Sequence, residues 1–139
     1  ALEGLIDIKS MLGLEKWKVV AQGGHHKLGK LYFIHGDQIA GGVNAAKNAV
    51  EAYMQNVRLG HFHTYQAATK TSAVDAKLGK TGIVVPCLCT KDPKYNEGRP
   101  NRWVQGFLYG YLHPDGFFND YVVTILNGRC AVEGKTYQG

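Results

Sequence analysis

Three histidines stand where imidazole groups can take part in metal chemistry. His35 follows the apolar run Lys30–Ile34. His61 and His63 follow a second apolar run that ends at Leu59. In extended backbone, residues two apart point to the same side with Cα atoms about 6–7 Å apart, so such a pair can converge on one metal ion or on two adjacent ions. Neutral imidazole binds zinc, manganese, iron and nickel. The pattern predicts a metal site, but histidines that only satisfy hydrogen bonds remain an open alternative.

The segments around these histidines predict a β-α-β unit. Lys30–Ile34 is a continuous apolar run, short enough for a strand buried on both faces, and Asn56–Leu59 is a second short strand. Between them, apolar residues recur at helical spacing over Ala45–Tyr53, with Asn44 as a candidate N-cap. A helix between two strands favours parallel strands. Ligands of open α/β sheets gather beyond the carboxyl ends of strands, so both histidine loops are expected to meet there.

The rest of the chain predicts short strands, turns and one short helix. We expect an amphipathic helix at Leu5–Leu14, a strand at Trp17–Ala21 and a turn at Gly23-Gly24. Short β-like runs lie within Gln66–Asp75 and Thr81–Thr90, followed by a polar loop over 91–101.

A β-hairpin is predicted near the C-terminal end. Trp103–Leu112 and Phe117–Leu126 are its strands, because His113–Gly116 has the proline, aspartate and glycine of a tight turn. One face of the first strand is aromatic, and we expect that face to pack in the core: Trp103, Phe107, Tyr109 and Tyr111.

The composition is that of an ordinary soluble globular domain. Of 139 residues, 45% are hydrophobic and 19% are charged, so we expect one domain over 1–139. No apolar run approaches the roughly 20 residues that span a bilayer, and Ala1–Asp7 lacks the pattern of a signal peptide. We expect a cytoplasmic protein without a membrane partner. The net charge of +5 is permissive for phosphate or nucleic acid.

The three cysteines do not suggest a disulfide framework, because their number is odd. Cys87 and Cys89 would face the same side of a strand. They could be half of a zinc site, but no second pair has the usual spacing. With Cys130, we interpret them as buried free thiols in a reducing cytoplasm.

The two histidine segments resemble the last two motifs of calcineurin-like metallophosphoesterases. Those motifs read as an apolar strand with His-Gly, then Gly-His-x-His. Here they are Phe33-Ile-His-Gly36 and Val57-Arg-Leu-Gly-His-Phe-His63, one crossover helix apart. Leu28-Gly-Lys-Leu, leading into the first motif, is similar to the phage and bacterial branch of DNA-repair-exonuclease-like phosphoesterases. The resemblance runs from about residue 12 to residue 66, and the β-rich tail is compatible with the second sheet of the family.

This resemblance implies an α/β fold, a partial metallophosphoesterase sandwich in which a β-α-β unit precedes a mainly antiparallel sheet. It implies that His35 and His61 bind one divalent metal ion and that His63 binds another, with Mn, Zn, Fe or Ni as the metal. Relatives hydrolyse phosphomonoesters or phosphodiesters, including DNA and RNA.

The earlier motifs of the family are Asp-x-His, Gly-Asp-x-x-Asp and Gly-Asn-His-Asp/Glu, and none occurs in residues 1–139. By the resemblance, the chain corresponds to a C-terminal half, with the carboxylate ligands elsewhere and its catalytic acid and base unknown. We expect a larger or split enzyme in which an N-terminal half, or self-association, covers exposed apolar surface.

Two other functions stay open from the sequence. The basic charge, the polar loop, and Tyr95 and Trp103 as stacking groups fit a non-catalytic nucleic-acid-binding module. A mononuclear zinc hydrolase would use the three histidines and leave a fourth position open. It would need a general base such as Asp37 or Asp75.

Overall fold

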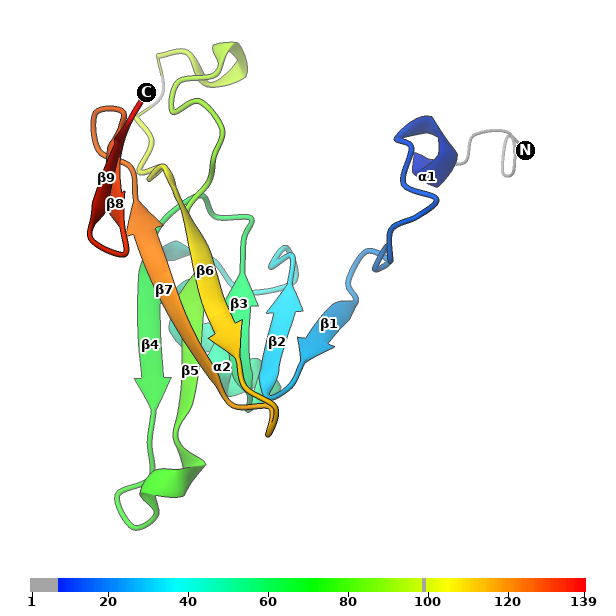
Figure 1. The fold of residues 1–139 in the computed structure, drawn as a ribbon, viewed down its shortest axis with the longest axis vertical. Coiled ribbons are helices and arrows are strands. Elements are labelled where there is room, and N and C mark those ends of the chain that lie inside the picture. Colours follow the sequence, from blue (N-terminus) through cyan, green and yellow to red (C-terminus); the bar gives the residue numbers. More distant parts are fainter. Residues whose placement is uncertain (1–7, 99) are drawn as a thin grey trace.

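The computed structural model describes residues 8–98 and 100–139 (Figure 1). Its helices and strands, in chain order, are α1 (Ile8–Met11), β1 (His25–Leu28), β2 (Leu31–Ile34), α2 (Ala45–Tyr53), β3 (Asn56–Leu59), β4 (Gln66–Lys70), β5 (Lys80–Val84), β6 (Gly106–Leu112), β7 (Phe118–Thr124), β8 (Arg129–Val132) and β9 (Lys135–Gln138). The fold is mixed α/β: a five-stranded mixed sheet that contains a β-α-β unit, followed by two small antiparallel hairpins. No helix in these ranges is long and apolar enough to cross a bilayer.

Three parallel strands end at one edge of the five-stranded sheet. The strand order is β1-β2-β3-β5-β4. Strands β2, β3 and β5 run parallel, and β1 and β4 are antiparallel edge strands. Ile34 pairs with Leu59, and Leu59 pairs with Val84, so the loops after β2, β3 and β5 leave the sheet side by side. The predicted β-α-β unit is confirmed, and those loops carry His35, the other histidine pair and the cysteine pair.

Helix α2 covers one face of the sheet with small side chains. Its buried residues are Ala45, Ala46, Ala49 and Val50. A Cβ built on Gly82 of β5 would collide with the Ala46 carbonyl oxygen, so the helix lies this close only over a glycine. Val57, Leu59 and Val84 fill the space between helix and sheet, and all three are fully buried. Full burial of each such side chain stabilises the fold by about 1.5–3 kcal/mol.

The β6–β7 hairpin crosses the opposite face of the sheet, in front of it in Figure 1, with α2 behind. A buried ion pair holds it there. Arg58 of β3 is 2% exposed and donates through Nε and Nη2 to the carboxylate of Asp120 in β7. The same guanidinium donates to the Thr81 carbonyl at 3.0 Å, and its carbon lies 5.4 Å from the centroid of the Phe118 ring. The ion pair fixes the hairpin over β3, the strand that leads to His61.

The turn of this hairpin has the predicted chemistry. The Gly116 N–H donates to the His113 carbonyl at 2.9 Å, and Gly116 has φ +78°. The Gly116 carbonyl accepts a hydrogen bond from the Lys30 N–H at 2.9 Å. The tip of the hairpin is therefore anchored on the turn between β1 and β2.

Two N-terminal predictions need correction. Trp17–Ala21 is not a strand, and the first strand is His25–Leu28. Trp17 is 69% exposed because this segment has no strand beside it to pair with. The helix predicted at Leu5–Leu14 ends at Met11, three residues early, and residues 5–7 of that prediction lie outside the described part of the chain. The predicted turn at Gly23-Gly24 is confirmed by the Gly24 N–H to Ala21 carbonyl bond of 2.9 Å.

Two predictions about side chains are also wrong. Asn44 precedes α2 but makes no side-chain capping bond; the Ala46 N–H donates instead to Oε1 of Gln66, from β4, at 3.3 Å. The aromatic face of the hairpin does not pack in the core. Tyr111 is 53% exposed, because the alternate face, with Asp120, is turned toward the sheet.

Candidate metal centre

His35 and His61 come together beyond the ends of β2 and β3. The Gly60 N–H donates to the His35 carbonyl at 3.0 Å and joins the two loops. Nδ1 of His61 lies 3.2 Å from Nε2 of His35, and the ring centroids are 5.0 Å apart with planes at 75°. Both residues are exposed. Adjacent parallel strands thus place two imidazoles together, as their positions in the sequence predict.

The separation of these two nitrogens fits one shared metal ion. Imidazole nitrogens lie about 2.0–2.1 Å from zinc, so two of them on one ion lie roughly 2.8–3.4 Å apart, from octahedral to tetrahedral geometry. The observed 3.2 Å falls within that interval. It also fits a hydrogen bond in which one neutral ring donates to the other. A shared ion would lie off the line between the two nitrogens, so each ring would turn to point its lone pair at the ion.

His61 and His63 do not have the extended backbone that their sequence pattern suggests. His61 has φ +67°, and the Phe62 N–H donates to the Gly60 carbonyl at 2.8 Å, which makes His61 the centre of a γ-turn. His63 has φ +55°. Left-handed backbone at a residue other than glycine costs about 1–3 kcal/mol, and such residues gather at functional sites. The two side chains therefore have different neighbours: His61 lies against His35, and His63 lies against Cys89.

A groove of about 690 Å³ borders the His35–His61 pair. His26 of β1 and Asp37 line it together with the pair, and the segment 20–24 closes one side. Asp37 is exposed. The groove is open, so a ligand can reach the two imidazoles from solvent.

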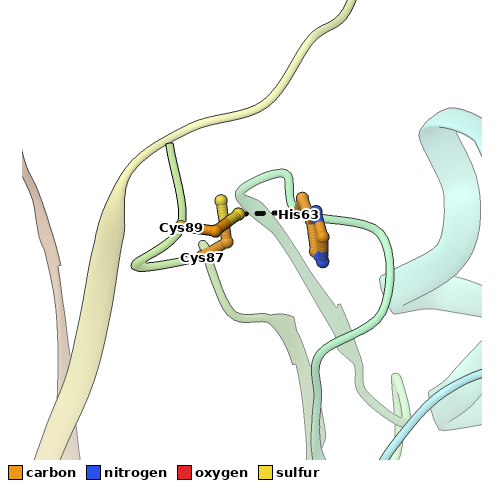
Figure 2. Close-up of side chains that lie close together, drawn as sticks. All are labelled: His63, Cys87 and Cys89. Atoms are coloured by element: carbon orange, nitrogen blue, oxygen red, sulfur yellow. Dashed lines mark hydrogen bonds between the residues drawn. The ribbon is translucent and has the colours of Figure 1, made fainter. Parts of the chain in front are cut away.

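His63 lies with the two cysteines, away from this pair of rings. Its Nδ1 is 3.9 Å from Sγ of Cys89, and one ligand atom from each of His63, Cys87 and Cys89 lies within 4.8 Å of the other two. Figure 2 shows the imidazole facing the two thiols. The ring also meets the edge of Trp103 at a centroid distance of 4.4 Å. Within 8–98 and 100–139, this is the one group of three or more such side chains that could hold a metal ion.

Backbone hydrogen bonds position the cysteine loop. After β5, the Cys87 N–H donates to the Val104 carbonyl at 3.0 Å, and the Gly106 N–H donates to the Cys87 carbonyl at 2.9 Å. The Val104 N–H donates to the His63 carbonyl at 2.8 Å. The segment that leads into β6 therefore bridges the His63 loop and the cysteine loop.

The cysteines are free, as the sequence indicates, but they are not buried. Cys87 and Cys130 are half-buried and Cys89 is exposed. For Cys87 and Cys89 the reason is that β5 ends at Val84 and these two thiols follow in a loop. Partial burial and the neighbouring Cys89 thiol raise the pKa of Cys87 above its usual value. All three residues of this cluster stand out in the sequence. Their proximity could not be predicted, because it depends on the pairing of β3 with β5.

Comparison with protein-family models, with curated proteins and with solved structures finds no match for this chain. The resemblance to metallophosphoesterases rests on the two histidine motifs and the interval between them.

Proposed function

We propose that this chain supplies the histidine part of the metal centre of a metal-dependent phosphoesterase. The observation that carries the proposal is the 3.2 Å separation of the His61 and His35 ring nitrogens, at the carboxyl ends of adjacent parallel strands. The fold we propose is the C-terminal part of a metallophosphoesterase sandwich. The five-stranded sheet with α2 on one face and a hairpin on the other is compatible with it.

The residues of the chain have separate tasks in this proposal. His35 and His61 hold one ion (Mn, Zn, Fe or Ni), and His63 is a ligand of a second, as the resemblance implies. An ion held there supplies Lewis-acid stabilisation of phosphoryl oxygens and activates water. The groove beside the pair receives the phosphate group. The remaining carboxylate ligands come from an N-terminal half or a partner chain.

The substrates we propose are phosphate esters, with DNA or RNA among the diesters. An aromatic pair beside the His63 loop supports nucleic acid: Tyr95 is 75% exposed, and its ring centroid is 6.3 Å from that of Trp103. Exposed aromatic rings are platforms on which bases stack. The same pair would serve a non-catalytic nucleic-acid-binding module. DNA binding that falls with salt but is unaffected by a chelator or by His61→Ala would favour that module.

The proposal is tested with inorganic phosphate as the probe. Manganese is paramagnetic, so phosphate bound to protein-held Mn²⁺ gives a broadened ³¹P signal. We expect broadening beyond that of free Mn²⁺, and we expect it to be lost in His61→Ala. The matched control is His113→Ala, in the hairpin turn, where the ring hydrogen-bonds to Asn119 and packs near Phe117. Broadening that is equal in His61→Ala and in the unchanged protein would overturn the proposal.

Hydrolysis of bis-p-nitrophenyl phosphate is measured on the same samples. The chain lacks the carboxylate motifs that the resemblance implies, so we expect bound phosphate with little turnover. Robust turnover that His61→Ala removes would support the function still more directly, and would show that the chain completes its own site.

A further inference from the structure

We propose that His63, Cys87 and Cys89 form a thiolate zinc site, separate from the ion at His35 and His61. The proposal goes beyond the phosphoesterase function and does not depend on it. It agrees with the resemblance in making His63 a metal ligand, and it adds two thiolate partners that the resemblance does not imply.

The geometry of the cluster is close to that of a tetrahedral zinc site. With Zn–S of about 2.3 Å and Zn–N of about 2.0–2.1 Å, tetrahedral angles place a nitrogen and a sulfur about 3.6 Å apart and two sulfurs about 3.8 Å apart. In the structure Nδ1 of His63 is 3.9 Å from Sγ of Cys89, and the three ligand atoms all lie within 4.8 Å of one another. Small side-chain rotations bring them onto one ion.

The ligand types select a thiophilic metal. Thiolates favour zinc over manganese and magnesium, which prefer oxygen ligands. Two cysteines and one histidine are a known zinc ligand set in which the fourth position is left to water or another ligand. The His35–His61 pair has no sulfur ligand beside it among the residues that line its groove. The two sites therefore differ in the metal they prefer, and they can be titrated separately.

The backbone holds these ligands in place without the metal. The Val104 segment bonds to both His63 and Cys87. Nε2 of Gln105 donates to the Cys89 carbonyl at 3.1 Å, and the edge of Trp103 packs against the His63 ring. A zinc ion here would join the loops that follow β3 and β5 and fix them beside the His35–His61 pair. A weak hydrogen bond between Cys89 and His63 is the alternative, and it needs no contribution from Cys87.

Cobalt(II) is the probe, because tetrahedral thiolate–cobalt gives a sulfur-to-metal charge-transfer band and intense visible bands. We expect one equivalent to develop both bands, and one equivalent of zinc to bleach them. Cys89→Ser changes an exposed side chain, so the core is unaffected, and we expect cobalt and zinc affinity to fall at least about 10-fold. His63→Ala and Cys87→Ser should do the same. The matched control, Cys130→Ser, should leave the bands unchanged.

The two proposals fail in distinguishable ways. Cys89→Ser should leave Mn²⁺-dependent broadening of phosphate intact, and His35→Ala should leave the cobalt bands intact. A thiol reagent gives an independent readout: zinc should protect two thiols and leave Cys130 reactive. Absence of the charge-transfer band, or a band that persists in Cys89→Ser, would overturn the zinc site, whatever the outcome with phosphate.

Discussion

Removal of the Asp120 carboxylate leaves Arg58 as an unpaired charge between the sheet and the β6–β7 hairpin. Arg58 is 2% exposed and the side chain of Asp120 is 10% exposed, so little water reaches either charge. Breaking a buried ion pair on one side costs about 3–5 kcal/mol. Arg58 keeps its bonds to the Val57 carbonyl and to Thr81. We therefore expect Asp120→Ala to lower the free energy of unfolding by about 3 kcal/mol, the lower end of that range.

Urea unfolding followed by circular dichroism measures this loss. A domain is typically stable by about 5–15 kcal/mol, so a loss of this size shifts the midpoint clearly. The matched control is Asp92→Ala. Asp92 is exposed, and its contact with Asn101 is a long one of 3.5 Å, so we expect a change within about 0.5 kcal/mol.

A double variant distinguishes the loss of the ion-pair attraction from the cost of leaving the Arg58 charge buried and unpaired. Arg58→Met with Asp120→Leu removes both charges and keeps apolar volume, and such replacements are often neutral or stabilising. We expect it to recover most of the stability lost in Asp120→Ala. An Asp120→Ala protein within 0.5 kcal/mol of the unchanged protein, by the measure used for surface sites, would refute the reasoning that this pair holds the hairpin on the sheet.

Two further predictions concern the helix contact and the hairpin end. Gly82→Ala should destabilise the fold by about 1–3 kcal/mol in urea unfolding, because the new Cβ collides with the Ala46 carbonyl; unchanged stability would mean that α2 lies farther from β5. The Tyr111 hydroxyl donates to the Glu133 carboxylate, which raises the pKa of Tyr111 above its usual value. The stabilisation from this bond is present below the ordinary tyrosine pKa of about 10 and is lost as pH rises through the raised pKa. Glu133→Gln should move the tyrosinate absorbance titration to lower pH, and an unmoved titration would contradict the bond.

The β-α-β unit could be predicted because its signals are local. The apolar run before His35 and the helical spacing over Ala45–Tyr53 each lie within one element. Parallel pairing follows from the crossover helix, and it places both histidine loops at one edge. The proximity of His35 and His61 could therefore be predicted from the sequence.

The His63–Cys87–Cys89 cluster could not be predicted, because it depends on strand order. Strand β5 pairs with β3 and leaves β4 at the edge, whereas strands adjacent in sequence are more often neighbours in space. Only this insertion brings the cysteine loop to His63. The γ-turn at His61 is a second feature without a sequence signal, since nothing in Gly60–His63 requires left-handed histidines.

The orientation of the hairpin was also beyond the sequence. Alternation showed that Tyr109 and Tyr111 share a face, but not which face turns inward. The ion pair between Arg58 and Asp120 decides it, and these residues are 62 positions apart. Trp17–Ala21 shows the opposite case, a segment with strand-forming residues but no neighbouring strand, so its side chains remain exposed.

Manganese binding by the His35–His61 pair is the most direct test of the proposed metal centre. Mn²⁺ is titrated into the purified chain, with free ion followed by electron paramagnetic resonance, for the unchanged protein, His35→Ala, His61→Ala and the control His113→Ala. We predict that each change in the pair weakens binding at least about 10-fold and that the control binds as the unchanged protein does. Equal Mn²⁺ affinity in all four proteins, or no binding by the unchanged chain, would contradict the account.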